Sequence, residues 1–350
     1  MSEEGALRHR SASVALVGLI SLTLAVGGCV GGRSPQATRS QPANRASASE
    51  VSSPTPVIIR PSMARRTGGL AIGGAPGRIR PLTPRGPGRA LLDCTEWCRD
   101  VEGRWSPDGT LFAFDTSHAR GKASDGIYVV DLASETVRRL VSSDVVSEPA
   151  WSPDGSRLAY TEQGRILVVN VDGTGRTSVA ETRGGAGSPS VPSWSPDGSR
   201  VVYSVGGRIY VVGLDGSSPV FLLKGFGPAW SPDGSIVYVA GGSIRDPSGC
   251  EIRATADDGR HSSTLVDLAT IPADHHRCEL ADQLEWSPDG TKLAVLVSRQ
   301  HTPRSRIEAA IYVVEPDSSR RRTRLLVPWG AYDWYGALAW RPALDDPIFD

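Results

Sequence analysis

The sequence predicts an all-β fold, a β-propeller with six blades of four antiparallel strands each, and three observations lead to it. The pentapeptide Trp-Ser-Pro-Asp-Gly occurs five times, and Trp340-Arg341-Pro342 is a degenerate sixth copy. Successive tryptophans of these copies are 36 to 56 residues apart, about the length of one blade. Each intact copy is followed by short runs of β-branched and aromatic residues, which indicate further strands.

The pentapeptide has the composition of a tight turn between two antiparallel strands. Serine opens a type I turn, proline presets φ at the next position, and glycine supplies a left-handed residue after the aspartate. The aspartates could suggest a metal or catalytic site, but a turn aspartate accepts hydrogen bonds from nearby backbone amides. We therefore expect a structural role for Asp108, Asp154, Asp197, Asp233 and Asp289. The tryptophans are expected to pack between blades.

Three strands are predicted after each pentapeptide, in the same order along the chain. After the first copy they cover residues 111–114, 127–131 and 136–140. The copies that start at Trp151 and Trp194 are followed by matching runs. Together with the strand that ends at the tryptophan, each repeat makes four antiparallel strands, as in a propeller blade.

The last copy lacks the residues for a complete blade, because only ten residues follow its predicted strand at 336–340. A single strand would leave an open sheet edge. Three runs near the other end of the chain, at 56–60, 69–72 and 77–82, have the pattern of the missing strands. We therefore expect these N-terminal strands to join the C-terminal strand and close the propeller.

The N-terminal segment has the features of a targeting signal. A basic stretch at 8–10 precedes the uncharged apolar stretch 11–26, which ends in Val26-Gly27-Gly28-Cys29. This ending resembles the lipobox of bacterial lipoproteins, so we expect a signal peptide at 1–28 and lipidation of Cys29. An uncleaved membrane anchor is the alternative, and both place the protein outside the cytoplasm and at a membrane. Residues 29–55, rich in Ser, Ala, Pro, Gln and Arg, predict a flexible tether.

The repeated pentapeptide, followed by a Leu-Ala-Phe-like and an Ile-Tyr-Val-Val-Asp-like strand, resembles the repeats of TolB-type, WD-like six-bladed propellers. The resemblance covers about residues 56–342 and leaves a short tail at 343–350. It implies a scaffold that recognises a partner or ligand, because such propellers serve as periplasmic binding proteins, sensors and peptidase domains. We find no counterpart of the separate N-terminal domain of TolB itself, so no TolB-specific partner is carried over.

Four cysteines remain besides Cys29, and an extracytoplasmic location favours disulfides between them. The predicted loops would allow Cys250 to pair with Cys278, and Cys94 to pair with Cys98. A four-thiolate zinc site is the alternative, but the usual two-residue spacing of zinc ligands is lacking. We expect no metal and no cofactor.

The loops between blades carry the candidate binding residues, since a rigid scaffold presents variable loops. These loops are rich in aromatic residues and contain two adjacent histidines. Aromatic side chains at a channel mouth could stack on sugars or grip peptide side chains, or they could only cover the junction of the ring. The candidates are Trp97, Asp274, His275, His276, Trp329, Tyr332, Trp334 and Tyr335.

The function expected from these features is non-catalytic recognition in the cell envelope. A formal net charge of zero argues against a general nucleic-acid binder. The sequence has no Gly-x-Ser-x-Gly elbow, His-Glu-x-x-His motif or phosphate-binding loop. The expected partner is a protein, or a carbohydrate or peptide ligand. The alternatives are an envelope-assembly scaffold and an extracytoplasmic lyase or glycan hydrolase that uses the central funnel, with His275 or His276 beside Asp274 or Asp282.

Overall fold

The computed structural model describes residues 58–59, 69–72, 78–83, 86–87, 92–93, 100–117, 125–131, 133–143, 146–181, 192–241, 250–267, 283–299, 308–316, 322–330 and 338–341. The chain divides into two compact units, Met1–Glu50 and Val51–Asp350, and every described residue belongs to the second. The predicted signal peptide, its lipidation site Cys29 and the whole predicted tether lie outside the described residues.

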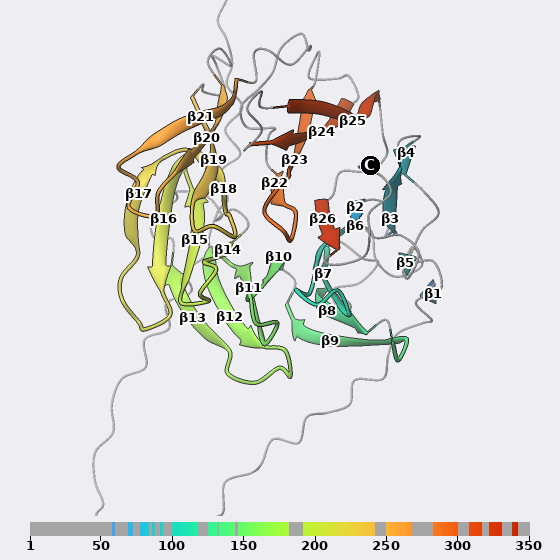
Figure 1. Cartoon of the computed structure of the whole chain (residues 1–350). Helices are drawn as coiled ribbons and strands as arrows, with labels where there is room; N and C mark the ends of the chain where they lie inside the picture. Colours follow the sequence, from blue (N-terminus) through green and yellow to red (C-terminus); the bar gives the residue numbers. More distant parts are fainter. Residues whose placement is uncertain are drawn as a thin grey trace, which may run out of the picture. The chain divides into compact units, whose positions relative to one another are not determined.

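Five sheets of the second unit are four-stranded antiparallel propeller blades, each formed by consecutive strands of the chain (Figure 1). The first three are β6 (Asp100–Trp105), β7 (Leu111–Ser117), β8 (Gly126–Asp131) and β9 (Thr136–Ser142); β10 (Val146–Trp151), β11 (Arg157–Glu162), β12 (Arg165–Asn170) and β13 (Thr177–Glu181); and β14 (Ser193–Trp194), β15 (Arg200–Val205), β16 (Arg208–Gly213) and β17 (Val220–Lys224). The next two are β18 (Phe226–Trp230), β19 (Ile236–Ala240), β20 (Glu251–Thr255) and β21 (Ser262–Asp267); and β22 (Gln283–Trp286), β23 (Leu293–Arg299), β24 (Glu308–Glu315) and β25 (Arg322–Gly330).

The predicted count of six four-stranded blades is wrong, because the structure has five of them and one further sheet of six strands. That sheet combines the two ends of the described chain. Its main path is β1 (Ile58–Ile59), β5 (Leu92–Asp93), β3 (Arg78–Thr83), β2 (Gly69–Ile72) and β26 (Leu338–Arg341), and β4 (Gly86–Pro87) pairs with β3. The antiparallel pairing of β2 with β26 confirms that an N-terminal strand joins the C-terminal one.

The order of the N-terminal strands within this sheet differs from the prediction. The sequence pattern matched residues 69–72 to the third strand of a blade and left 56–60 for the place before it. Instead β2 itself lies next to β26, with all four residues of each strand paired. Of the run 56–60 the structure describes Ile58–Ile59, which pairs with β5 at the far edge of the sheet. The place beside β26 is taken by β2, which equals it in length.

The innermost strands follow one another in a closed cycle. In sequence order, β6, β10, β14, β18, β22 and β26 each contact the next, and β26 contacts β6. Figure 1 shows the two colour extremes meeting there, with the red β26 beside the labels of β2 and β6. The strand from the C-terminal end thus stands between the first and the fifth four-stranded blade.

The pentapeptide turns are built as predicted, and their aspartates are structural. In the first copy, the amide of Gly109 donates to the carbonyl of Ser106 at 2.8 Å, which closes the turn. The Ser106 hydroxyl donates to Asp108 Oδ1 at 2.6 Å, and the amide of Thr110 donates to the same oxygen at 3.1 Å. The amide two residues after the aspartate makes this bond in all five copies. These carboxylates are therefore committed to holding the turn.

The tryptophans pack between neighbouring sheets, which confirms the prediction for them. Trp151 packs with Ala113, Ile127 and Val129 of the preceding blade, and Trp194 packs in the same way against the next pair of blades. Five of the six motif indoles are at most 8% exposed, and Trp286 is half-buried. The core of the protein therefore lies between the sheets, and the inner strands are left to line a central cavity.

Candidate functional site

A cavity of about 440 Å³ lies where the inner strands meet. Residues of all five intact pentapeptides and of the degenerate sixth line it. Much of its wall consists of proline rings, because the motif proline of each intact copy faces it and two further prolines precede the third and fourth tryptophans. These prolines are Pro107, Pro153, Pro192, Pro196, Pro228, Pro232 and Pro288.

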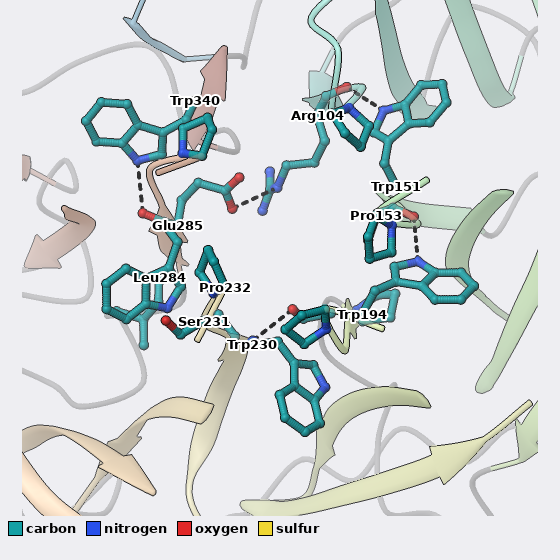
Figure 2. Close-up of a pocket in the computed structure, with 18 of the residues that line it drawn as sticks. Arg104, Trp151, Pro153, Trp194, Trp230, Ser231, Pro232, Leu284, Glu285 and Trp340 are labelled. Atoms are coloured by element: carbon teal, nitrogen blue, oxygen red, sulfur yellow. Dashed lines mark hydrogen bonds and ion pairs between the residues drawn. The ribbon is translucent and has the colours of Figure 1, made fainter. Parts of the chain in front are cut away.

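The indole N–H groups of three tryptophans are used to join neighbouring sheets. Nε1 of Trp151 donates to the carbonyl of Arg104 at 2.9 Å, and Nε1 of Trp194 donates to the carbonyl of Ala150 at 3.0 Å. Nε1 of Trp340 donates to the carbonyl of Glu285 at 2.9 Å. Figure 2 shows these indoles set back from the centre of the cavity. These three indoles therefore serve the contacts between sheets.

The size and charge of the residue before each motif tryptophan differ between the copies. At four of the six copies this residue is small, namely Ala150, Ser193, Ala229 and Ala339. At the other two it is Arg104 on β6 and Glu285 on β22, and both line the cavity. These two are the only ionisable side chains among the described residues that line it. The small residues leave the space open, and the two long ones give it its chemistry.

Arg104 and Glu285 form an ion pair across the cavity, as Figure 2 shows. Arg104 Nε lies 3.2 Å from Glu285 Oε2, and the two side chains are 12% and 23% exposed. Nη1 of Arg104 also donates to the carbonyl of Gly103 at 3.2 Å. Burial raises the pKa of the Glu285 carboxyl, and the neighbouring Arg104 guanidinium acts in the opposite direction.

The same wall of the cavity holds the C-terminal strand in place. Gln283 Oε1 accepts a hydrogen bond from the backbone amide of Leu338 at 2.7 Å. The Trp340 indole is bound to the carbonyl of Glu285, as described above. Because β26 lies between β22 and β6, the Arg104–Glu285 pair joins the two strands on either side of it. The pair therefore has a structural role at the closure as well as a place on the cavity wall.

The structure does not place the predicted binding face. Trp97, Asp274, His275, His276, Tyr332, Trp334 and Tyr335 lie outside the described residues, as do Cys94, Cys98 and Cys278. Trp329 was expected in a loop between blades, but its backbone belongs to the outer strand β25, which runs on to Gly330 paired with Ala309. Because β24 has eight residues and its Ala309 pairs with Gly330, the outer strand β25 continues beyond Pro328.

The cysteine prediction is tested only at Cys250. Its side chain is 2% exposed and is disulfide-bonded, and its partner lies outside the described residues. Pairing with Cys278, and the separate Cys94–Cys98 bridge, stay predictions.

The described residues contain no group of three or more His, Cys, Asp or Glu side chains that could hold a metal ion. Nor does any helix in the described ranges have the length and apolarity needed to cross a membrane.

No protein-family model and no curated protein matches the chain. Among solved structures, a protein from Agrobacterium tumefaciens described as a TolB is similar, with a TM-score of 0.51 and 17% identity over 74% of this chain and 88% of that one. An oligogalacturonate lyase from Vibrio parahaemolyticus has a TM-score of 0.44 and 12% identity, over 64% and 66% of the two chains. The Swd1 β-propeller domain of Myceliophteria thermophila has a TM-score of 0.44 and 13% identity, over 69% and 89%. The first likeness supports a TolB-like propeller fold and carries no activity with it.

The Arg104–Glu285 pair was not predicted from the sequence, although a signal for it is present. Aligning the six copies on their tryptophans shows Arg, Ala, Ser, Ala, Glu and Ala at the preceding position. Opposite charges at two of six otherwise small positions would have indicated a pair inside the cavity.

Proposed function

We propose that the protein is a non-catalytic recognition module of the cell envelope, tethered to a membrane through Cys29, and that it binds its ligand in the central cavity. The cavity lined by the six motif tryptophans and their neighbours carries this proposal. Its volume of about 440 Å³ lies within the range of small-ligand pockets. Its lining combines apolar proline rings with polar side chains that include the Arg104–Glu285 pair, and polar groups placed among apolar ones are typical of binding sites.

The proposal extends the six-bladed arrangement expected from the sequence. We take the mixed sheet, through β26, to fill the sixth place between β22 and β6, since it contacts both of them. The Asp residues of the turns are held by their own hydrogen bonds and are unsuited to catalysis. A lyase or glycan hydrolase with the same fold would need catalytic groups, and the predicted ones lie outside the described residues.

Blocking the cavity tests the proposal. Ala229→Leu puts a larger side chain into the cavity wall, and Ala133→Leu adds the same atoms on an exposed turn as the matched control. Compounds that copurify with the full-length protein should be lost from the Ala229→Leu variant and kept by Ala133→Leu. They should also be recovered chemically unchanged after incubation. Equal retention by both variants contradicts a cavity ligand, and conversion to a product supports the enzyme alternative.

The membrane tether is tested separately. Full-length protein should sediment with membranes, and Cys29→Ser should release it or leave it unprocessed. An unchanged distribution and size of the Cys29→Ser variant would contradict lipidation at this cysteine.

A further inference from the structure

The Arg104–Glu285 pair leaves hydrogen-bonding groups open to the cavity. A guanidinium has five N–H donors, and Arg104 uses one at Nε and one at Nη1. Its Nη2 group and Glu285 Oε1 have no partner among the residues that the structure describes, and neither atom is sealed from solvent. The pair therefore presents a cationic donor and an anionic acceptor side by side.

Apart from the pair, no charged side chain among the described residues lines the cavity. Ala150, Ala229 and the proline rings are among the apolar groups of its lining. The hydroxyl of Ser193 accepts a hydrogen bond from the backbone amide of Trp230 at 2.9 Å. A ligand in this cavity thus meets one pair of charged groups together with apolar proline rings and alanine side chains.

The charges of the pair sum to zero, and this restricts the ligand. A monoanion bound to Arg104 would lie beside the Glu285 carboxylate, and a monocation bound to Glu285 would lie beside the Arg104 guanidinium. Either would put like charges together in a partly desolvated site, which is unfavourable. A ligand that carries both charges close together would pair each with its opposite.

We propose that the cavity binds a small zwitterion of the α-amino acid class with an apolar side chain. Its carboxylate would lie on Nη2 of Arg104, its ammonium group on Oε1 of Glu285, and its side chain against the proline rings. This inference rests on the proposed function, because it names the ligand class of the same cavity. Charge-assisted hydrogen bonds at both ends would fix the orientation of the ligand.

Three probes that share the same branched alkyl group test the proposal. They are L-leucine, its analogue without the amine, 4-methylpentanoate, and its analogue without the carboxylate, 3-methylbutylamine. Isothermal titration of the full-length protein should show leucine binding at least tenfold more tightly than either single-charge analogue. In Glu285→Gln the order should change, with 4-methylpentanoate gaining on leucine, since its carboxylate no longer meets an anion. The double variant Arg104→Met with Glu285→Met has no unpaired charge and should lose the preference for leucine.

The outcomes separate this inference from the proposed function. Equal binding of the three probes, binding of leucine unchanged in the double Met variant, or no binding of any probe would overturn the zwitterion site. If copurifying compounds are then still lost from Ala229→Leu, recognition in the cavity stands and only the ligand class is wrong. If Ala229→Leu also retains every compound, the proposed function falls with it. Circular dichroism of each variant establishes that it is folded before titration.

Discussion

Two tryptophans of this protein are similar in burial and in their arginine neighbours but differ in the indole hydrogen bond. Trp194 and Trp230 are both 6% exposed, and an arginine lies over each ring, Arg157 at 5.0 Å and Arg200 at 5.2 Å. The indole of Trp194 donates to the carbonyl of Ala150, whereas the buried indole N–H of Trp230 has no acceptor among the described residues. Replacing each by phenylalanine therefore removes similar apolar area and different polar interactions.

The expected difference follows from those polar terms. Trp194→Phe loses a hydrogen bond with a net value of about 0.5–1.5 kcal/mol. Trp230→Phe removes a buried donor without a partner, and such a group costs about 1–3 kcal/mol. Trp194→Phe should therefore lower the free energy of unfolding by at least about 1.5 kcal/mol more than Trp230→Phe. Urea unfolding followed by far-ultraviolet circular dichroism measures both, with equal m-values as the condition for comparison. Equal losses, or a larger loss for Trp230→Phe, would refute the reasoning.

Two further predictions concern the closure and the turns. Leu338 on β26 is fully buried, so Leu338→Ala should lower the free energy of unfolding by about 2–5 kcal/mol. The control Leu325→Ala, at a leucine that is 43% exposed, should lower it far less. Similar urea midpoints for the two variants would contradict a closing role for β26. Hydrogen bonds from the Ser195 hydroxyl and from the amide and hydroxyl of Ser199 lower the pKa of Asp197 from 3.8 to about 2. The stability that this carboxylate adds is therefore fully present above about pH 4 and is lost as the pH falls towards 2. The stability gap between the protein and Asp197→Asn should shrink over that range in urea titrations, and a gap independent of pH would show that the carboxylate charge is not involved.

Most of the repeat structure could be predicted from the sequence, because each repeat contains its own turn chemistry. Ser106, Asp108 and Gly109 specify a turn through contacts within a few residues, and the other copies repeat them. The joining of chain ends was also predictable, since an unpaired edge at β26 requires a partner. The order of the N-terminal strands was not, because it depends on which short run matches β26 in length.

The difference between Trp194 and Trp230 was beyond the pentapeptide pattern. Both belong to identical copies, so their local sequences predict the same hydrogen bond. What differs lies in a neighbouring residue, since the Ser193 hydroxyl accepts a hydrogen bond from the backbone amide of Trp230. The repeated pentapeptide therefore predicts the structure of the turn, but not the indole hydrogen bond between neighbouring blades.

The candidate site shows the same division between what repeats and what does not. Each of the five intact copies places its tryptophan between sheets and its preceding residue on the cavity wall, so the scaffold is set by what these copies share. The chemistry of the cavity is set by the two copies that depart from a small residue, Arg104 and Glu285. Neither residue indicates a site by itself, because a single charge before a tryptophan could equally face solvent. Only the closed cycle of inner strands brings β6 and β22 to either side of β26, and with them the two charges to 3.2 Å. A binding site of this kind is thus formed by the residues that differ between the copies, and it can be recognised once the closure of the fold is known.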